Sequence, residues 1–144
     1  MPITLTNNIR DLITFHALEI HPNECCGFLY GYDREDGIRE IREAIPVINS
    51  RDGNQRNRFE IHPEDYMQAE KYSKENDISF LGIYHSHPDS PAIASEYDRS
   101  HAFPFFSYII VSITKDKMLD IRSWILDDEF QFEEEKISFQ GQEQ

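Results

Sequence analysis

The chain has 144 residues, of which 39% are hydrophobic and 28% charged, a composition typical of one soluble globular domain with its own core. Its 27 acidic and 14 basic residues give a net charge of −13, which argues against nucleic acid as a partner because the phosphates would be repelled. There is no apolar run of the about 18 residues that a membrane span needs, and no leader-like start, so we expect no membrane partner and a cytoplasmic location.

Apolar residues at helical spacing over residues 5–20 predict a first helix. Thr6 or Asn7 can cap its start, and Pro22 disfavours its continuation past His21. We expect this helix to bury one face, which carries Leu5, Ile9, Leu12, Ile13 and Ile20.

Two strands and a second helix come next. Residues 23–32 and 38–48 favour paired strands joined by a turn at residues 33–37. We expect the second of these strands to contribute core contacts from Ile41, Ile45, Val47 and Ile48. After a polar loop at residues 50–58, a short strand is predicted at Phe59, Glu60 and Ile61. Pro63 suits the first turn of a helix that we expect to run to about Asn76.

The first predicted strand contains the two cysteines of the chain, Cys25 and Cys26. A disulfide between neighbours is strained, so the pair does not indicate a disulfide-stabilised secreted fold, and we expect reduced thiols. They could be redox-active or bind a metal, but we favour a small buried residue for at least one of them.

The remaining chain predicts a buried strand at residues 78–84, a helix beginning at Ser95, and strands at residues 106–113, 119–125 and 130–132. We interpret the acids of the last part as a solvated face or edge; they are Asp127, Asp128, Glu129, Glu133, Glu134 and Glu135. This order predicts an α/β (α+β) fold with one mixed β-sheet flanked by helices. We expect a single domain at residues 1–139 and a disordered tail at residues 140–144.

Two histidines follow the predicted buried strand at 78–84. His85 and His87 are two residues apart, so in a strand they point to the same face, about 6.6 Å apart along it. Their imidazoles can then converge on one zinc ion. Two polar residues that face solvent at a strand end are an equally open interpretation of this pair alone.

Asp98 lies eleven residues beyond His87 and could supply a third ligand. Ser95 and Asp98 also fit a capping box, in which both side chains bond to amides at the start of a helix. Glu24, at the start of the first predicted strand, is by itself most simply a solvated loop carboxylate. It gains significance if three protein ligands hold a metal, because a carboxylate can take the proton of a metal-bound water.

Taken together, these residues resemble the signature of the JAMM (MPN-plus) metalloproteases: His85-x-His87, seven residues, Ser95, two residues, Asp98. Residues 22–31 are similar to the glutamate segment of that family, and Phe103-Pro104 with residues 108–112 to its next strand. The resemblance covers roughly residues 1–126 and implies a cytidine-deaminase-like MPN architecture.

The resemblance also implies roles. His85, His87 and Asp98 would bind one catalytic Zn²⁺, Glu24 would act as general base and proton donor, and Ser95 would stabilise the oxyanion. The implied reaction is hydrolysis of a peptide or isopeptide bond after the Gly-Gly tail of a ubiquitin-like protein.

Relatives that cut ubiquitin chains carry a second zinc bound by histidines and cysteine, whereas only His101 and no cysteine follow Asp98 here. We therefore expect the chain to resemble the compact bacterial members that act on ubiquitin-like sulfur-carrier proteins, releasing cysteine or a short C-terminal extension. An isopeptidase for lysine-linked conjugates and a non-catalytic module that binds ubiquitin-like tails are the alternatives.

Overall fold

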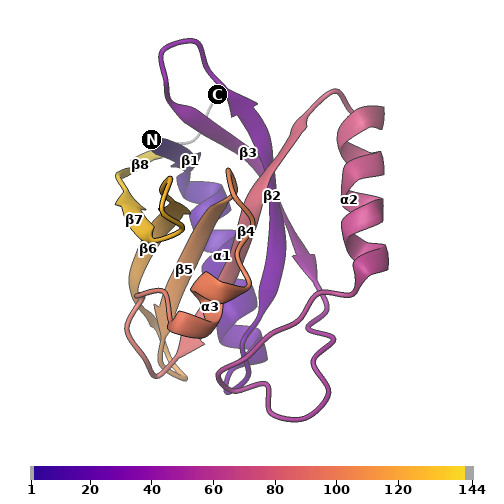
Figure 1. Cartoon of the computed structure of the whole chain (residues 1–144). Helices are drawn as coiled ribbons and strands as arrows, with labels where there is room; N and C mark the ends of the chain where they lie inside the picture. Colours follow the sequence, from indigo (N-terminus) through magenta and orange to yellow (C-terminus); the bar gives the residue numbers. More distant parts are fainter. Residues whose placement is uncertain (1, 142–144) are drawn as a thin grey trace.

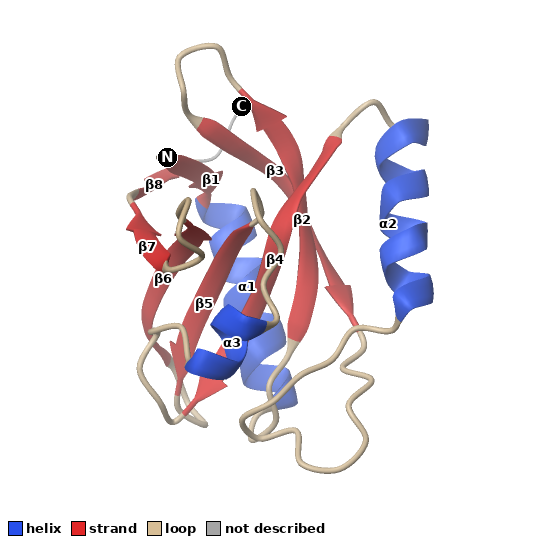
Figure 2. Cartoon of the chain, viewed as in Figure 1, coloured by secondary structure: helices blue, strands red, loops and turns tan. Residues whose placement is uncertain are grey.

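The computed structural model describes residues 2–141. Eight strands form one mixed sheet in the order β7-β6-β5-β4-β2-β3-β1-β8, with α1 against one face and α2 against the other (Figures 1 and 2). In chain order the elements are β1 (Ile3–Thr6), α1 (Asn7–Ile20), β2 (Cys26–Asp33), β3 (Arg39–Val47), α2 (Pro63–Glu75), β4 (Ser79–Pro88), α3 (Glu96–Ser100), β5 (Ser107–Ile113), β6 (Met118–Leu126), β7 (Phe132–Glu135) and β8 (Ile137–Gln140). The predicted α+β class, with a mixed sheet flanked by helices, is confirmed.

Helix α1 begins after Thr6, whose hydroxyl oxygen accepts the N–H of Ile9 at 3.1 Å as an N-cap. The predicted cap and end of this helix are confirmed, but the expected start at residue 5 is wrong, because residues 3–6 form β1. Leu5 is buried as predicted, but it belongs to a strand. Leu12 was predicted wrongly on the buried face, because it is 42% exposed on the outer side of the helix. α1 is 14 residues long, and no helix among residues 2–141 is long and apolar enough to cross a membrane.

The β2–β3 hairpin and α2 follow the prediction, whereas the short strand expected at residues 59–61 is absent from the structure. That segment lies along the 50–58 loop instead. The N–H of Ser50 bonds to the carbonyl of Glu60, and the N–H of Glu60 bonds to the side chain of Asn49. Ile48 was also predicted wrongly as a core contact, because it lies beyond the end of β3 and is 82% exposed.

The C-terminal segment closes the sheet. β7 pairs with β6 at one end of the strand order and β8 pairs with β1 at the other, yet only Lys136 separates β7 from β8. The N–H of Ile3 bonds to the Lys136 carbonyl at 2.9 Å, so the two edges of the curved sheet meet (Figure 1). β8 extends through Gln140, the first residue of the predicted tail, and residues 142–144 lie outside the described part of the chain.

Phe130 and Glu135 differ from the sequence-based expectation for this segment. Phe130 lies in the turn before β7, not in a strand, and is 57% exposed. Glu135 is not on a solvated face: it is 1% exposed, and its carboxylate accepts the Ser123 hydroxyl at 2.8 Å. Burial raises the pKa of Glu135. The strand pairing of Glu135 with Ser123 turns this side chain inward, which the composition of the acidic run does not reveal.

Gly82 is required where β4 and β5 run side by side. A Cβ atom at Gly82 would lie 2.0 Å from the carbonyl oxygen of Ser107, its partner in the parallel ladder. We expect Gly82→Ala to lower the free energy of unfolding by about 3 kcal/mol, because the two backbones must separate. Urea unfolding measures this loss, and Gly141→Ala, with open space around it, is the control. Equal stability of the two variants would contradict this close approach.

Candidate metal centre

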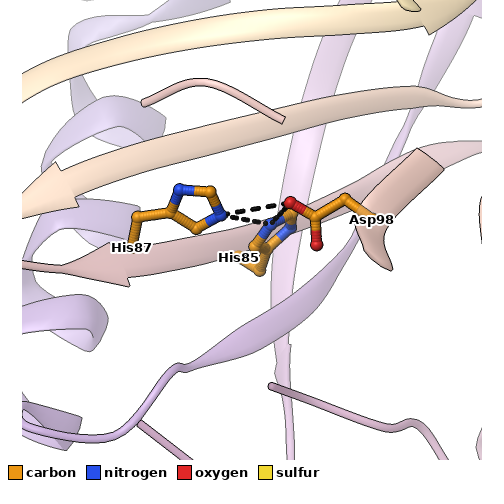
Figure 3. Close-up of side chains that lie close together, drawn as sticks. All are labelled: His85, His87 and Asp98. Carbon is orange, nitrogen blue, oxygen red and sulfur yellow. Dashed lines mark hydrogen bonds and ion pairs between the residues drawn. The ribbon is translucent and has the colours of Figure 1, made fainter. Parts of the chain in front are cut away.

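Strand β4 carries the two histidines, in the middle of the sheet between β2 and β5. His85 and His87 point to the same face, as predicted from their spacing, and are 1% and 8% exposed. Their Nε2 atoms are 3.3 Å apart (Figure 3). The solvent-facing alternative is therefore wrong: both rings are buried, and they converge.

Asp98 reaches these histidines from the first turn of α3 (Figure 3). Its Oδ2 lies 3.2 Å from Nε2 of His87 and 3.4 Å from Nε2 of His85. The same oxygen accepts the N–H of Ser95 at 2.9 Å, while the Ser95 hydroxyl oxygen accepts the N–H of Asp98 at 3.0 Å. The capping box and the cluster with the histidines, weighed as alternatives from the sequence, are thus both present.

The separations within this cluster fit a tetrahedral zinc ion. Two ligand atoms at about 2.0–2.1 Å from such an ion lie about 3.3–3.4 Å from each other. The three pairs formed by His85, His87 and Asp98 are 3.2, 3.3 and 3.4 Å apart. The imidazole and carboxylate donors are also types that zinc accepts, so the residues present fit the metal that the sequence predicts.

Hydrogen bonding fixes which nitrogen of His87 faces the cluster. Its Nδ1 lies 2.8 Å from the carbonyl oxygen of Pro91, so Nδ1 carries a hydrogen. When the ring is neutral, Nε2 therefore presents its lone pair to the cluster. His85 is held by packing, since its ring lies 4.7 Å from that of Phe59, and its buried Nδ1 has no hydrogen-bond partner within residues 2–141. Contacts within the chain therefore orient both rings.

The charges of the cluster are coupled. Burial would raise the pKa of Asp98, but the interaction with His85 and the hydrogen bonds from both histidines outweigh it and hold the pKa well below its usual range. Burial would likewise lower the pKa of His87, but the bonds to Asp98 and Pro91 raise it. The carboxylate thus stays ionised, as a metal ligand must be.

Glu24 lies beside the cluster and is 3% exposed, not a solvated loop residue. Cys26 pairs with His85 in the β2–β4 ladder, which places the segment just before β2 next to His87. The Glu24 backbone is fixed by its N–H to the Gln55 carbonyl at 2.7 Å. Its Oε1 is buried without a hydrogen-bond partner in the described chain, and burial raises its pKa to about 7. Such a carboxyl group can accept and return a proton near neutral pH.

The two cysteines take no part in this cluster. Both are free and buried, as the sequence predicts, and Cys25 packs in the core that α1 covers. Burial raises the pKa of Cys25 to about 12 and that of Cys26 further still. Thiols with so little thiolate at neutral pH are poor nucleophiles and poor metal ligands.

Two pockets flank the cluster. The first, here called the aromatic pocket, has a volume of about 310 Å³, and its lining includes Phe59, Tyr66, His85, Tyr97, Asp98 and Phe103. The second, the Glu24 pocket, has about 240 Å³ and is lined by Glu24, Asn57, Arg58, His87, Ser90, Pro91, Ile93 and Ser95. A larger hollow of about 490 Å³ between β3 and α2 contains none of the predicted site residues.

All five residues predicted for the site therefore lie around one point: the three candidate ligands form the cluster, and Glu24 and Ser95 line the adjoining pocket. Arg58 and Tyr97 also line the two pockets but were not predicted as site residues. Both lie outside the sheet, on the loop before α2 and on α3, and no periodic pattern or short motif marks them. Their contact across the site, with the Arg58 guanidinium carbon 4.3 Å from the centre of the Tyr97 ring, is visible only in the fold.

Comparison with known proteins adds independent information. Residues 6–127 match the family described as prokaryotic homologs of the JAB domain. A desampylase of Haloferax volcanii is 31% identical over 131 residues, covering 88% of this chain and 90% of that protein. A desampylase of Pyrococcus furiosus is 26% identical over 114 residues, covering 79% of this chain and 74% of that protein. The solution structure of a protein from Desulfitobacterium hafniense has a TM-score of 0.84 at 32% identity and covers 97% of this chain and 94% of its own.

Proposed function

Because the chain belongs to the family of prokaryotic JAB-domain homologs, we propose that it is a zinc-dependent hydrolase of ubiquitin-like protein substrates. It would cleave the peptide or isopeptide bond that follows the Gly-Gly tail of a ubiquitin-like or sulfur-carrier protein. The observation that carries this proposal is the His85–His87–Asp98 cluster, with its zinc-like separations, beside a buried glutamate of raised pKa. The desampylase names of two relatives support a hydrolase that acts on a protein modifier.

In this proposal His85, His87 and Asp98 hold the metal, which supplies an acidified water and a Lewis acid for the scissile carbonyl. Glu24 takes a proton from the attacking water as the new C–O bond forms. The carboxyl group of Glu24 then gives this proton to the nitrogen as the C–N bond breaks. The raised pKa of Glu24, about 7, suits both steps.

Ser95 is suited to stabilise the oxyanion. Its hydroxyl oxygen already accepts the N–H of Asp98, so the cap does not consume the hydroxyl hydrogen, which is free to be donated. That hydrogen can be directed at the negatively charged oxygen of the tetrahedral intermediate. The two hydrogen bonds of the cap fix Ser95 relative to Asp98. The oxyanion donor therefore keeps a constant position beside the candidate metal ligand.

The leaving group defines the candidate activities. We favour release of cysteine or a short C-terminal extension from a carrier protein. The desampylase relatives make an isopeptidase for lysine-linked conjugates the second candidate. A module that only grips ubiquitin-like tails needs no buried carboxyl group beside the cluster, which disfavours the non-catalytic alternative.

Metal removal tests the proposal. We expect the purified chain to contain about one zinc ion, as a single three-ligand site predicts. We expect it to cleave a ubiquitin-like carrier whose Gly-Gly tail is extended by cysteine or joined to a lysine. Dialysis against a chelator should abolish cleavage, because the attacking water loses its activation, and added zinc should restore it. Mass spectrometry of the carrier measures the loss of cleavage and its recovery. A zinc-loaded chain that binds the carrier but cleaves neither form would identify a binding module.

A further inference from the structure

The two pockets beside the cluster cannot be equivalent if the proposed function holds. Glu24 returns its proton to the departing nitrogen, so the group attached to that nitrogen must lie on the Glu24 side. The Gly-Gly tail, on the other side of the scissile bond, then lies towards His85 and the aromatic pocket. The smaller Glu24 pocket, about 240 Å³, therefore receives the leaving group.

Arg58 supplies the positive charge of this pocket. The side-chain amide of Asn49 donates to the carbonyls of both Glu24 and Arg58, at 3.1 and 3.2 Å, which fixes these two backbones next to each other. The guanidinium group lies over the ring of Tyr97, 4.3 Å from its centre. Glu24 and Arg58 therefore line the same pocket.

The guanidinium of Arg58 has no carboxylate within ion-pair distance in the part of the chain that the structure describes. Arg56, which is exposed, also forms no ion pair within residues 2–141, but it lines neither pocket. The arginines that form ion pairs with acidic side chains are Arg10, Arg34, Arg39, Arg42, Arg51, Arg99 and Arg122. Arg58 is instead half-buried in the Glu24 pocket and stacked on an aromatic ring. Its Nη1 donates to the carbonyl of Asn57 at 2.9 Å, and its other N–H groups are available to an anion.

The chemistry of a released amino acid matches this arrangement. In a C-terminal residue, the carboxylate is bonded to the carbon that also carries the scissile nitrogen. The group that protonates the nitrogen and the group that binds the carboxylate must therefore line one small pocket. Glu24 and Arg58 do so. A guanidinium also matches a carboxylate through two parallel hydrogen bonds. The ε-nitrogen of an acceptor lysine carries no such carboxylate on the adjacent carbon.

We propose that Arg58 is a specificity-determining residue that binds the α-carboxylate of the residue released from the Gly-Gly tail. This inference rests on the proposed function and narrows it. The chain prefers a leaving group that is a free α-amino acid, such as cysteine, over the side chain of a lysine in a folded protein. Tyr97 holds the guanidinium in place by stacking.

Three forms of one carrier test the preference: Gly-Gly-cysteine as the free acid, the same form as the cysteine amide, and an isopeptide to lysine. For the zinc-loaded wild type we expect kcat/KM to fall about 10- to 100-fold from acid to amide, the size of a charge-assisted hydrogen bond. Arg58→Met should lose a similar factor on the acid but little on the amide, so that the acid-to-amide ratio falls to near one. Arg58→Lys should recover part of the ratio.

Arg56→Met is the matched control, because Arg56 is exposed on the same loop and lines neither pocket. It should keep the wild-type ratio. A binding measurement is independent of turnover: titration with L-serine, which lacks a zinc-binding thiol, should shift the NMR signals of Arg58 and Tyr97, and serinamide should not.

The role of Arg58 is overturned if Arg58→Met loses kcat/KM equally on the acid and the amide, or if the wild type has an acid-to-amide ratio near one. Either result leaves the proposed hydrolase activity intact. If the zinc-loaded wild type cleaves none of the three forms, the proposed function itself fails, and the role of Arg58 with it.

Discussion

Replacing Glu24 with glutamine should reduce kcat by about 10²- to 10⁴-fold, the contribution of a positioned general acid–base group. Glutamine keeps the size of the side chain but cannot take the proton of the attacking water or return it to the leaving nitrogen. Zinc should stay bound, since the three candidate ligands are His85, His87 and Asp98. Single-turnover cleavage and metal analysis of the same sample measure the two quantities.

The same substitution should stabilise the metal-free protein at alkaline pH. Burial raises the pKa of Glu24 from 4.5 to about 7. Below pH 4.5 the carboxyl group is protonated in the folded and unfolded chain alike, and it has no effect on stability. Between pH 4.5 and about 7, Glu24 ionises in the unfolded chain but stays largely protonated in the folded chain. Above about pH 7 the buried charge lowers the free energy of unfolding by about 3 kcal/mol.

Urea unfolding of the metal-free protein at pH 5 and pH 8 separates these cases. The stability of the wild type should fall between the two pH values by more than that of Glu24→Gln. Glu133→Gln, at an exposed position of β7, is the control and should follow the wild type. Retained turnover in Glu24→Gln would remove Glu24 as the base. If the difference in free energy of unfolding between wild type and Glu24→Gln is the same at pH 5 and pH 8, the pKa of Glu24 is not raised.

The double substitution His85→Ala, His87→Ala should eliminate zinc binding and all turnover above background. Two of the three candidate ligands are lost, and Asp98 alone cannot hold the ion. In the wild type, zinc at 1,000 times its dissociation constant should raise the free energy of unfolding by about 4 kcal/mol, and in the variant by nothing. Thermal unfolding with and without zinc, together with metal analysis, measures this.

Asp98→Asn is the companion variant if the double substitution disturbs the buried strand. An asparagine oxygen can still accept the N–H of Ser95, so the cap of α3 survives, while the anionic ligand is lost. We expect normal folding with weakened zinc binding. Zinc retained at wild-type stoichiometry in the double variant would show that the cluster is not the metal site.

The clustering of the candidate site residues was predictable from local signals. His85 and His87 share a strand face by simple alternation, and Ser95 and Asp98 share a helix start through a three-residue spacing. The position of Glu24 was not predictable from its own surroundings, since its burial depends on the pairing of β2 with β4. Glu24 was assigned to the site only because residues 22–31 resemble the glutamate segment of a known family.

The missed features depend on contacts that no local pattern contains. β1 and β8 have four residues each and are defined by parallel pairing with each other, while the predicted strand at residues 59–61 has no neighbouring strand to pair with. Arg58 is a loop residue whose significance comes from its position over Tyr97. Glu135 was predicted on a solvated face with the neighbouring acids. Its strand pairing with Ser123 instead buries the side chain.

The joining of β1 to β8 also has a consequence for how the domain is made. The hydroxyl of Thr4 bonds to the carbonyl of Ser138, 134 positions further along the chain. Loop closure costs more over a longer separation, so we expect this pairing to form late in folding. During synthesis β1 has an unpaired edge until β8 has been made, and such an edge can pair with other chains. The nascent domain is therefore most prone to aggregation until its last strand is in place.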